Sequence, residues 1–194
     1  MKVAILGWGI DTQDVEPYLR SQGHDIDIFD EKDKLFGDLS GYGMIVRSPG
    51  VYRYRKELKD LNNVTSKIKL FFDVCPGKII GVTGTKGKGT TSTLIYEILK
   101  KAGKDVYLGG NIGLGIFRDL AKMTADSWVV LELSSFQLID LHKSPHISVT
   151  LMTTLDHLDY HKDEAEYVSA KTPISKFQGP NDYSIYNIDY LNSV

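Results

Sequence analysis

The sequence predicts an α/β protein in which parallel sheets occupy two consecutive units. Short apolar runs alternate with helical stretches along the chain, and this order makes each helix a right-handed crossover between parallel strands. Two of the runs, at residues 2–6 and 78–82, lead directly into glycine-rich segments, as expected of buried strands that enter tight turns. The 194 residues suffice for two small domains, and a Pro-Gly break divides them into residues 1–75 and 76–194.

The N-terminal unit is expected to be a Rossmann-like parallel-sheet domain. Its elements are strands at residues 2–6, 25–30 and 44–46 and helices at residues 12–22 and 53–61. Gly23 stands in the usual position after the first helix. Pro17 must lie in the first turn of that helix or bend it, because proline has no N–H to donate.

The second unit is expected to be a P-loop α/β domain. Its elements are strands at residues 78–82, 106–108, 128–133, 147–152 and 183–186 and helices at residues 90–102 and 164–177. One face of the first of these helices should pack against the sheet; it carries Leu94, Ile95, Ile98 and Leu99. No closing helix follows the last strand, so we expect an incomplete unit and a fragment of a longer protein.

The composition favours a cytoplasmic protein. Lys and Arg number 23 and Asp and Glu 25, and the net charge of −2 lacks the basic excess that nucleic-acid or membrane-surface binding needs. No apolar run approaches the roughly 18 residues of a membrane span, and the N-terminus has no signal-peptide pattern. Cys75 is the only cysteine, so a reducing compartment fits. We expect neither nucleic-acid partners nor membrane insertion.

Residues 81–91, GVTGTKGKGTT, have the context of a phosphate-binding loop between an apolar strand and an amphipathic helix. Glycines let successive backbone N–H groups converge on phosphate oxygens, and the helix N-terminus adds positive potential. Lys88 would reach the outer phosphates of the nucleotide. The predicted nucleotide contacts are Gly84, Thr85, Lys86, Gly87, Lys88, Gly89, Thr90 and Thr91.

The loop departs from the strict pattern G-x-x-x-x-G-K-[ST]. Val82 occupies the first glycine position, and Gly89 stands where the Mg²⁺-binding hydroxyl should be. Thr90, one residue later, is the expected substitute ligand, with Thr91 as the second choice. The pattern predicts binding of nucleotide phosphates but does not identify the reaction.

A less specific glycine turn follows the first strand. Gly7 and Gly9 fit the start of a dinucleotide fingerprint, but Thr12 occupies the place of its third glycine. Asp30 ends the second strand about 20 residues further on, where an acid can bind a ribose hydroxyl. A plain glycine turn beside a surface aspartate is the alternative interpretation.

Further segments are characteristic of one enzyme family. Residues 109–113 read GGNIG and residues 132–138 read ELSSFQL, and with the phosphate loop they resemble the Mur ligases of bacterial cell-wall synthesis. ELSSFQL is most similar to the branch that adds D-glutamate. TLDHLD at residues 154–159 and the Ala-Lys pair at 170–171 resemble two later family motifs. The likeness is best over residues 78–190 and looser before them.

The resemblance implies an ATP-dependent amide ligase. ATP would phosphorylate the terminal carboxylate of UDP-N-acetylmuramoyl-L-alanine, and the amine of D-glutamate would attack the acyl phosphate to give an amide, ADP and phosphate. A carboxylate is a poor electrophile until one oxygen becomes a leaving group, so these steps are chemically sound. The family's C-terminal amino-acid-binding domain is not accounted for, so we expect the isolated chain not to complete ligation.

The resemblance also implies the catalytic residues, namely Lys88, Glu132, His157 and Lys171. Glu132 ends a strand, where open α/β sheets place ligands, and would bind Mg²⁺ together with Thr90. His157 would bind a second Mg²⁺. Lys171 matches the family lysine that CO₂ carbamylates, which would turn a cation into an anion beside the metal.

The implied substrate contacts come from both units. They are Ile10, Asp11, Asp30 and Gly50 for the UDP group and Asn111 and Ser134 for the rest of the substrate, with Ser135 and Gln137 as weaker candidates. Asp11 stands where the relatives often carry a small hydroxyl residue, and its charge would repel the diphosphate. Arg47 is a candidate for a compensating cation.

Two other functions stay open. Residues 87–90, GKGT, fit the loop of folylpolyglutamate synthases better than the usual Mur loop, but those enzymes lack a preceding UDP-binding domain. A non-catalytic nucleotide-binding module of the GTPase type would need an N-K-x-D motif to read guanine, and the sequence has none. The first glycine turn and ELSSFQL therefore favour the Mur ligases.

Overall fold

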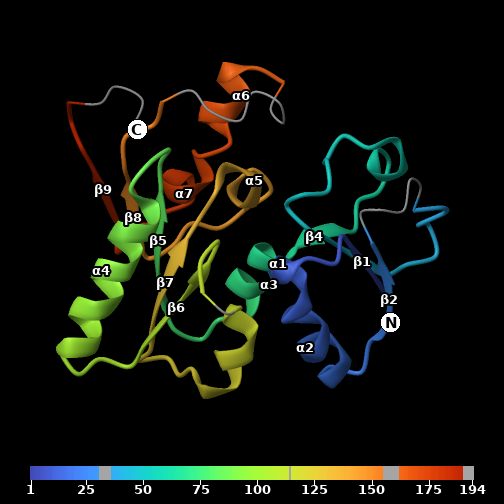
Figure 1. The fold of residues 1–194 in the computed structure, drawn as a ribbon, viewed down its shortest axis with the longest axis horizontal. Coiled ribbons are helices and arrows are strands. Elements are labelled where there is room, and N and C mark those ends of the chain that lie inside the picture. Colours follow the sequence, from blue (N-terminus) through green and yellow to red (C-terminus); the bar gives the residue numbers. More distant parts are fainter. Residues whose placement is uncertain (31–35, 114, 155–161, 190–194) are drawn as a thin grey trace.

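The computed structural model describes residues 1–30, 36–113, 115–154 and 162–189. Their strands form two sheets in which all paired neighbours are parallel (Figure 1). The first sheet has the order β2-β1-β3-β4, with β1 at Lys2–Leu6, β2 at Asp25–Phe29, β3 at Met44–Arg47 and β4 at Val64–Ser66. The second has the order β6-β7-β5-β8-β9, with β5 at Lys78–Thr83, β6 at Val106–Gly110, β7 at Trp128–Glu132, β8 at Ile147–Thr150 and β9 at Tyr183–Tyr186. The predicted α/β class is confirmed.

Helices and 3₁₀ turns connect these strands. They are α1 (Ile10–Gln13), α2 (Val15–Ser21), η1 (Lys56–Leu58), α3 (Lys67–Val74), α4 (Lys88–Lys101), η2 (Ile116–Lys122), α5 (Ser135–Leu138), α6 (Glu164–Ser169) and α7 (Pro173–Lys176). The helix expected at residues 12–22 is split in two, and Pro17 lies in the first turn of α2, where its missing N–H is tolerated. Within the described ranges, every helix is too short or too polar to span a bilayer.

β4 and α3 have no counterpart among the expected elements. The chain passes directly from one to the other at Ser66. The Ser66 side chain accepts a hydrogen bond from the backbone N–H of Lys69 at 3.2 Å, and this bond caps the helix. A serine before an amphipathic stretch is the signal in the sequence that marks this start.

Two expected helices are shorter than their sequence patterns indicate. Residues 53–61 contain only η1, and Leu58 is the one buried residue of that range. A helix that buries one side chain gains little from packing, so the rest of the segment stays irregular. Residues 164–177 break between α6 and α7, because Pro173 cannot donate a backbone hydrogen bond and begins a new helix at N1.

The two sheets share one apolar core. Alternate residues of a strand face opposite sides, and Val3 and Ile5 of β1 belong to the same buried cluster as Val129 and Leu131 of β7. α3 lies between the sheets (Figure 1) and contributes the fully buried Phe71 to this cluster. The two sheets are therefore joined by close packing and not only by the chain between them.

α4 covers the opposite face of the second sheet. Ile95 and Leu99 pack there beside Tyr96, but Leu94 and Ile98 are 59% and 58% exposed. The expectation that all four aliphatic residues share a packed face is wrong for these two. The four positions span about 140° around the helix, whereas a helix that packs on a core buries a stripe of about 100°. In α4 the buried stripe contains Ile95, Tyr96 and Leu99, so Leu94 and Ile98 lie outside it.

A buried ion pair connects segments from both units. Asp14, between α1 and α2, accepts a hydrogen bond from Lys67 Nζ at 2.9 Å through Oδ1. Its Oδ2 accepts one from the backbone N–H of Phe117 at 2.9 Å. Gly115 approaches so closely that a Cβ there would lie 2.6 Å from the Asp14 carboxyl carbon. Three segments that are distant in sequence therefore meet at one carboxylate.

Candidate functional site

The glycine-rich loop connects β5 to α4 at the carboxyl edge of the second sheet. β5 is the central strand, and the strand order reverses around it, which is the place where open α/β sheets bind ligands. Gly84 has φ +141°, and a Cβ there would lie 2.7 Å from Leu151 Cβ, so only glycine fits. Gly87, with φ +84°, begins the 14-residue α4. The loop thus has the strand, the glycines and the long helix that the sequence predicts.

Lys88 points back toward the loop that precedes it. Its Nζ donates a hydrogen bond to the backbone oxygen of Thr85 at 3.1 Å. A small cavity of about 20 Å³ adjoins this lysine, lined by Gly84, Thr85, Lys88, Ser134, Ser135, Tyr167 and Lys171. The structure therefore brings five of the predicted residues (Gly84, Thr85, Lys88, Ser134 and Lys171) around one cavity.

Lys171 lies between α6 and α7, and its side chain is buried. Its Nζ lies 4.5 Å from the centroid of the Tyr167 ring, a cation–π distance. The Tyr167 hydroxyl is in turn 3.0 Å from Thr85 Oγ1. Tyr167 therefore connects the predicted lysine to the phosphate loop, and no pattern in the sequence marks it for that role.

Glu132 is the last residue of β7 and is 5% exposed. Its Oε1 accepts a hydrogen bond from Asn111 Nδ2 at 3.1 Å. Its Oε2 lies 3.0 Å from the position that a Cβ on Gly89 would occupy. The predicted pair Asn111 and Glu132 therefore lies directly against the start of α4.

This arrangement fits a magnesium ion held mainly by phosphates. Carboxylate oxygen is a preferred Mg²⁺ ligand, and such sites need only one or two protein donors. In the described parts of the chain, no group of three or more His, Cys, Asp and Glu residues could hold a metal by itself. Thr90 is exposed and lines an open hollow together with Gly89, Thr93 and Leu94, and of these residues Gly89 is also close to Glu132.

Ser134 has a structural role that sequence reasoning missed. It caps α5 by accepting a hydrogen bond from the Gln137 backbone N–H at 3.3 Å, and Gln137 Oε1 accepts one from the Ser134 backbone N–H at 3.0 Å. This reciprocal pair is a capping box, and the spacing S-x-x-Q within ELSSFQL is its sequence signal. Part of that motif therefore serves to begin a helix directly after Glu132.

The glycine turn of the first unit is closed by its own side chains. Thr12, which is fully buried, donates from Oγ1 to the backbone oxygens of Gly7 at 2.6 Å and Gly9 at 3.2 Å. Gly7 has φ +84°, and its backbone N–H donates to Phe29 O at 2.8 Å. A Cβ on Gly7 would lie 2.8 Å from Ser48 Cβ, so the turns after β1 and β3 are in contact.

The predicted UDP contacts lie along this edge of the first sheet. Asp30 follows β2 and Gly50 follows β3, and both are exposed. Ile10 and Asp11 begin α1, but their side chains lie outside the described structure. The structure engages Arg47 elsewhere: its guanidinium pairs with Asp140 and donates to Val51 O at 2.6 Å.

A loop of the first unit also reaches the segment that holds Lys171. The Tyr54 hydroxyl donates to the Glu166 carboxylate of α6, and Lys162 Nζ lies 3.8 Å from the Tyr54 ring centroid. Burial, followed by the hydrogen bond to Glu166, raises the pKa of the Tyr54 phenol, so it stays protonated as the donor. His157, predicted as a metal ligand, lies outside the described residues.

Comparison with known proteins gives consistent results. The profile of the Mur ligase middle domain matches residues 82–193. A curated relative, the UDP-N-acetylmuramoylalanine–D-glutamate ligase of Acetivibrio thermocellus, is 37% identical over 214 residues, which cover 97% of this chain and 46% of the relative. The chain spans about half the length of the curated relatives it matches.

Two solved structures share the fold. One is the UDP-N-acetylmuramate:L-alanyl-gamma-D-glutamyl-meso-diaminopimelate ligase from Neisseria meningitides, with a TM-score of 0.58, 15% identity and coverage of 98% of this chain and 72% of that one. The other is the UDP-N-acetylmuramate-alanine ligase from Thermotoga maritima, with a TM-score of 0.54, 19% identity and coverage of 100% and 50%. At these identities the likeness shows the fold alone.

Proposed function

The chain belongs to the Mur ligase family, and on that premise we propose that it carries the substrate and nucleotide sites of an ATP-dependent amide ligase. The reaction would add D-glutamate to UDP-N-acetylmuramoyl-L-alanine through an acyl phosphate. The name of the curated relatives supports this choice of substrates. It also favours the Mur branch over folylpolyglutamate synthases, although the GKGT loop resembles theirs.

One observation carries the proposal: Lys88 and Lys171 line the same small cavity at the carboxyl edge of β5. Two cationic or modifiable amines next to a glycine loop suit a reaction in which negative charge accumulates on a transferred phosphoryl group. Lys88 would hold the outer phosphates of ATP. Lys171, carbamylated, would instead support the metal site as an anion.

Glu132 and Asn111 complete this part of the site. Glu132 would hold Mg²⁺, and Asn111 orients the Glu132 carboxylate through the 3.1 Å hydrogen bond. Mg²⁺, when bound, neutralises charge on the phosphates. Thr90 and His157 are proposed as further metal ligands, and Ser134 as a substrate contact beside the cavity.

The first unit would bind the UDP group. We assign this role to residues 1–75 and the nucleotide-phosphate role to residues 76–194. Ile10, Asp11, Asp30 and Gly50 are the proposed contacts, at the edge where the turns after β1 and β3 touch. We propose a cytoplasmic location, which suits a chain whose lone cysteine, Cys75, is a free thiol.

Calorimetric titration with UDP-N-acetylmuramoyl-L-alanine tests the proposal, with a pteroate substrate as the control ligand. We expect saturable binding of the UDP compound and none of pteroate. Binding of pteroate alone would assign the chain to the folate branch. If neither binds, the UDP site is refuted and MgATP titration tests the phosphate loop separately.

Two aspartates at opposite ends of β2, Asp25 in the strand and Asp30 directly after it, give a matched pair of variants. Asp30→Asn changes the carboxyl edge of the first sheet, whereas Asp25→Asn makes the same change at the other end of the strand. We expect Asp30→Asn to weaken binding of the UDP compound about tenfold, because a charged hydrogen bond is lost, and Asp25→Asn to leave it unchanged. Equal affinities in both variants would remove Asp30 from the site.

Catalysis by the chain alone is a separate test. Because it spans about half the length of its curated relatives, we propose that the 194 residues bind both ligands without completing ligation. Incubation with MgATP, D-glutamate and the UDP compound should give no UDP-N-acetylmuramoyl-L-alanyl-D-glutamate by mass spectrometry. Detection of that product would contradict the proposal.

A further inference from the structure

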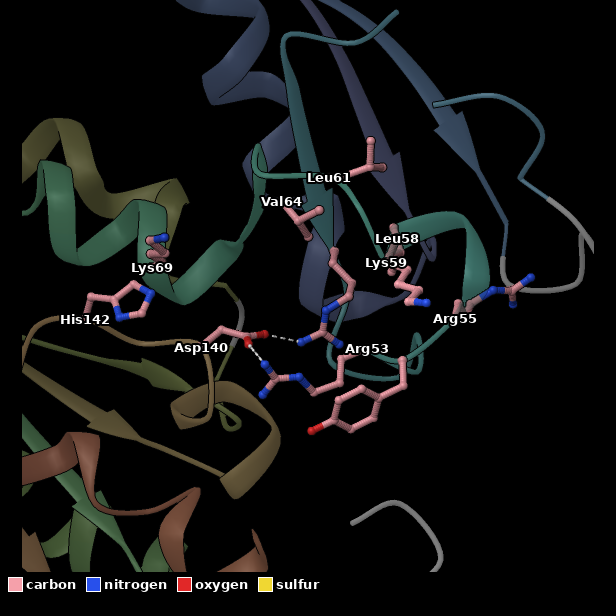
Figure 2. A pocket seen from close by; sticks show the side chains of 11 residues that line it. Arg53, Arg55, Leu58, Lys59, Leu61, Val64, Lys69, Asp140 and His142 are labelled. Carbon is pink, nitrogen blue, oxygen red and sulfur yellow. Dashed lines mark hydrogen bonds and ion pairs between the residues drawn. The ribbon is translucent and has the colours of Figure 1, made fainter. Parts of the chain in front are cut away.

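A second pocket lies between the first unit and the loop that follows α5. Its volume is about 470 Å³, within the range of small-molecule sites. Five cationic side chains line it, together with one carboxylate: Arg47, Arg53, Arg55, Lys59, Lys69 and Asp140. Figure 2 shows Lys69 and His142 on one side of this pocket and Lys59 and Arg55 on the other. We call it the basic pocket.

The positive charge in the basic pocket exceeds what the neighbouring carboxylates neutralise. Asp140 pairs with Arg47 and, at 3.1 Å, with Arg53, and Figure 2 shows it between two guanidinium groups. Arg55 pairs with Glu57 at 2.9 Å and lowers the pKa of that carboxyl, which therefore stays charged. These pairs involve the three arginines of the lining and neither of its two lysines.

The remaining charge is concentrated on two lysines from different elements. Lys59 follows η1 and Lys69 lies on α3. Within the described structure, neither forms an ion pair with a carboxylate. A cluster of like charges around a concave surface concentrates the potential and attracts an anion.

The rest of the lining is apolar. Leu58, Leu61 and Val64 form this part of the wall. A site of this kind suits a molecule that has a dianionic group and a compact apolar body, because the guanidinium forks and ammonium groups match phosphate oxygens while the leucines remove carbon surface from water. A phosphate monoester carries close to two negative charges at neutral pH.

We propose that the basic pocket binds a small organic phosphate monoester at a site separate from the nucleotide loop. In the described structure, neither the loop from Gly84 to Thr91 nor the proposed UDP contacts line this pocket. The phosphate lies in the pocket between Lys59 on one side and Lys69 on the other, where both charges attract it, and the organic part lies against Leu58 and Val64. The ion pairs of Asp140 with Arg47 and Arg53 hold the loop that follows α5 against the first unit and so fix this wall of the pocket.

Titration of the full chain with phenyl phosphate tests this proposal by calorimetry. The double variant Lys59→Ala/Lys69→Ala removes the two lysines, and Lys101→Ala/Lys104→Ala removes the same charge from exposed positions at the end of α4. We expect one saturable site, about tenfold weaker binding in the first double variant and unchanged binding in the second. If the first double variant is unstable, Lys59→Ala alone, at an exposed position, repeats the test.

Lys88→Ala separates this pocket from the phosphate loop. Binding of phenyl phosphate should persist in that variant, and binding of the UDP compound should persist in Lys59→Ala/Lys69→Ala. Three results would overturn the proposal. The first is no saturable binding of phenyl phosphate, and the second is equal weakening of its binding in both double variants. The third is loss of phenyl phosphate binding in Lys88→Ala but not in Lys59→Ala/Lys69→Ala. None of these results would alter the proposed ligase function, which depends on other residues.

Discussion

The two glycine turns of this chain occupy equivalent places and are built differently. Each follows an inner strand of a parallel sheet, β1 or β5, and each contains a glycine with φ +84°, Gly7 or Gly87. After Gly7 the helix α1 has only four residues, and Thr12 closes the turn with two hydrogen bonds to backbone oxygens. After Gly87 the helix α4 has 14 residues, and Gly89 leaves space in front of Glu132.

This difference separates a turn that is closed by its own hydroxyl from one whose lysine borders a cavity. In the first turn, the Thr12 hydroxyl is bonded to the backbone oxygen of Gly7, and Gly7 packs against the turn after β3. In the second, Lys88 and the start of a long helix border a cavity. A series of glycines is therefore a stronger indication of a phosphate site where the polar groups around it are left available. Four predictions test this distinction.

Asp14→Ala should have the largest effect on stability, because this carboxylate joins the segment after the first turn to α3 and to the backbone of Phe117. Removal of the carboxylate leaves the buried Lys67 ammonium unpaired, and breaking a buried pair costs about 3–5 kcal/mol. Urea denaturation measures the loss, with the exposed Asp25→Ala as the control. The double variant Asp14→Ala/Lys67→Met should recover only part of the stability, because the Phe117 N–H still lacks its acceptor. A loss below about 1 kcal/mol would show that the ion pair does not stabilise the contact between these segments.

Lys88→Ala should abolish binding at the second turn with little change in stability. We expect the MgATP affinity to fall at least about 100-fold, equivalent to about 2.7 kcal/mol, and the free energy of unfolding to change by less than about 0.5 kcal/mol. Calorimetry and thermal unfolding measure the two quantities, with Lys104→Ala as the matched control. Unchanged MgATP affinity would contradict the assignment of the loop.

Gly7→Ala and Gly87→Ala compare the two turns at the same backbone angle. In both variants an alanine must adopt a left-handed backbone angle, which lowers the free energy of unfolding by about 1–2 kcal/mol. Only Gly7→Ala adds overpacking, because its Cβ would lie 2.8 Å from Ser48 Cβ, whereas at Gly87 the nearest atom, Leu151 Cδ1, is 3.5 Å away. Denaturation should show Gly7→Ala as less stable by a further roughly 1–3 kcal/mol. Equal losses would mean that the first turn is not closely packed.

Thr12→Val should have the smallest effect of the four. It keeps the side-chain shape but leaves the buried oxygens of Gly7 and Gly9 without the hydroxyl donor, at a cost of about 1–2 kcal/mol. Thr93→Val, at an exposed position on α4, serves as the control and should stay within about 0.5 kcal/mol. The same stability in both variants would indicate that water replaces the hydroxyl.

Most of the fold follows from local sequence signals. Strands such as Lys2–Leu6 and Tyr183–Tyr186 match their expected ranges, because apolar and β-branched runs between turn residues specify strands locally. The limits of α4 differ from expectation by only one or two residues, since Gly87 and Gly103 flank it. The break before α7 also had a local signal, Pro173, although the pattern around it suggested one continuous helix.

The sequence by itself determined the α/β class, the glycine-rich loop between a strand and a long helix, and the family, because these depend on residues close together in the chain. Only the tertiary structure decided that Lys88 and Lys171 line one cavity, that Arg47 faces Asp140, and that Lys59 and Lys69 share the basic pocket. Such pairs are separated by up to 93 residues, and nothing in local patterning encodes which distant side chains meet. Their approach depends on the strand order and on the core that the two sheets share.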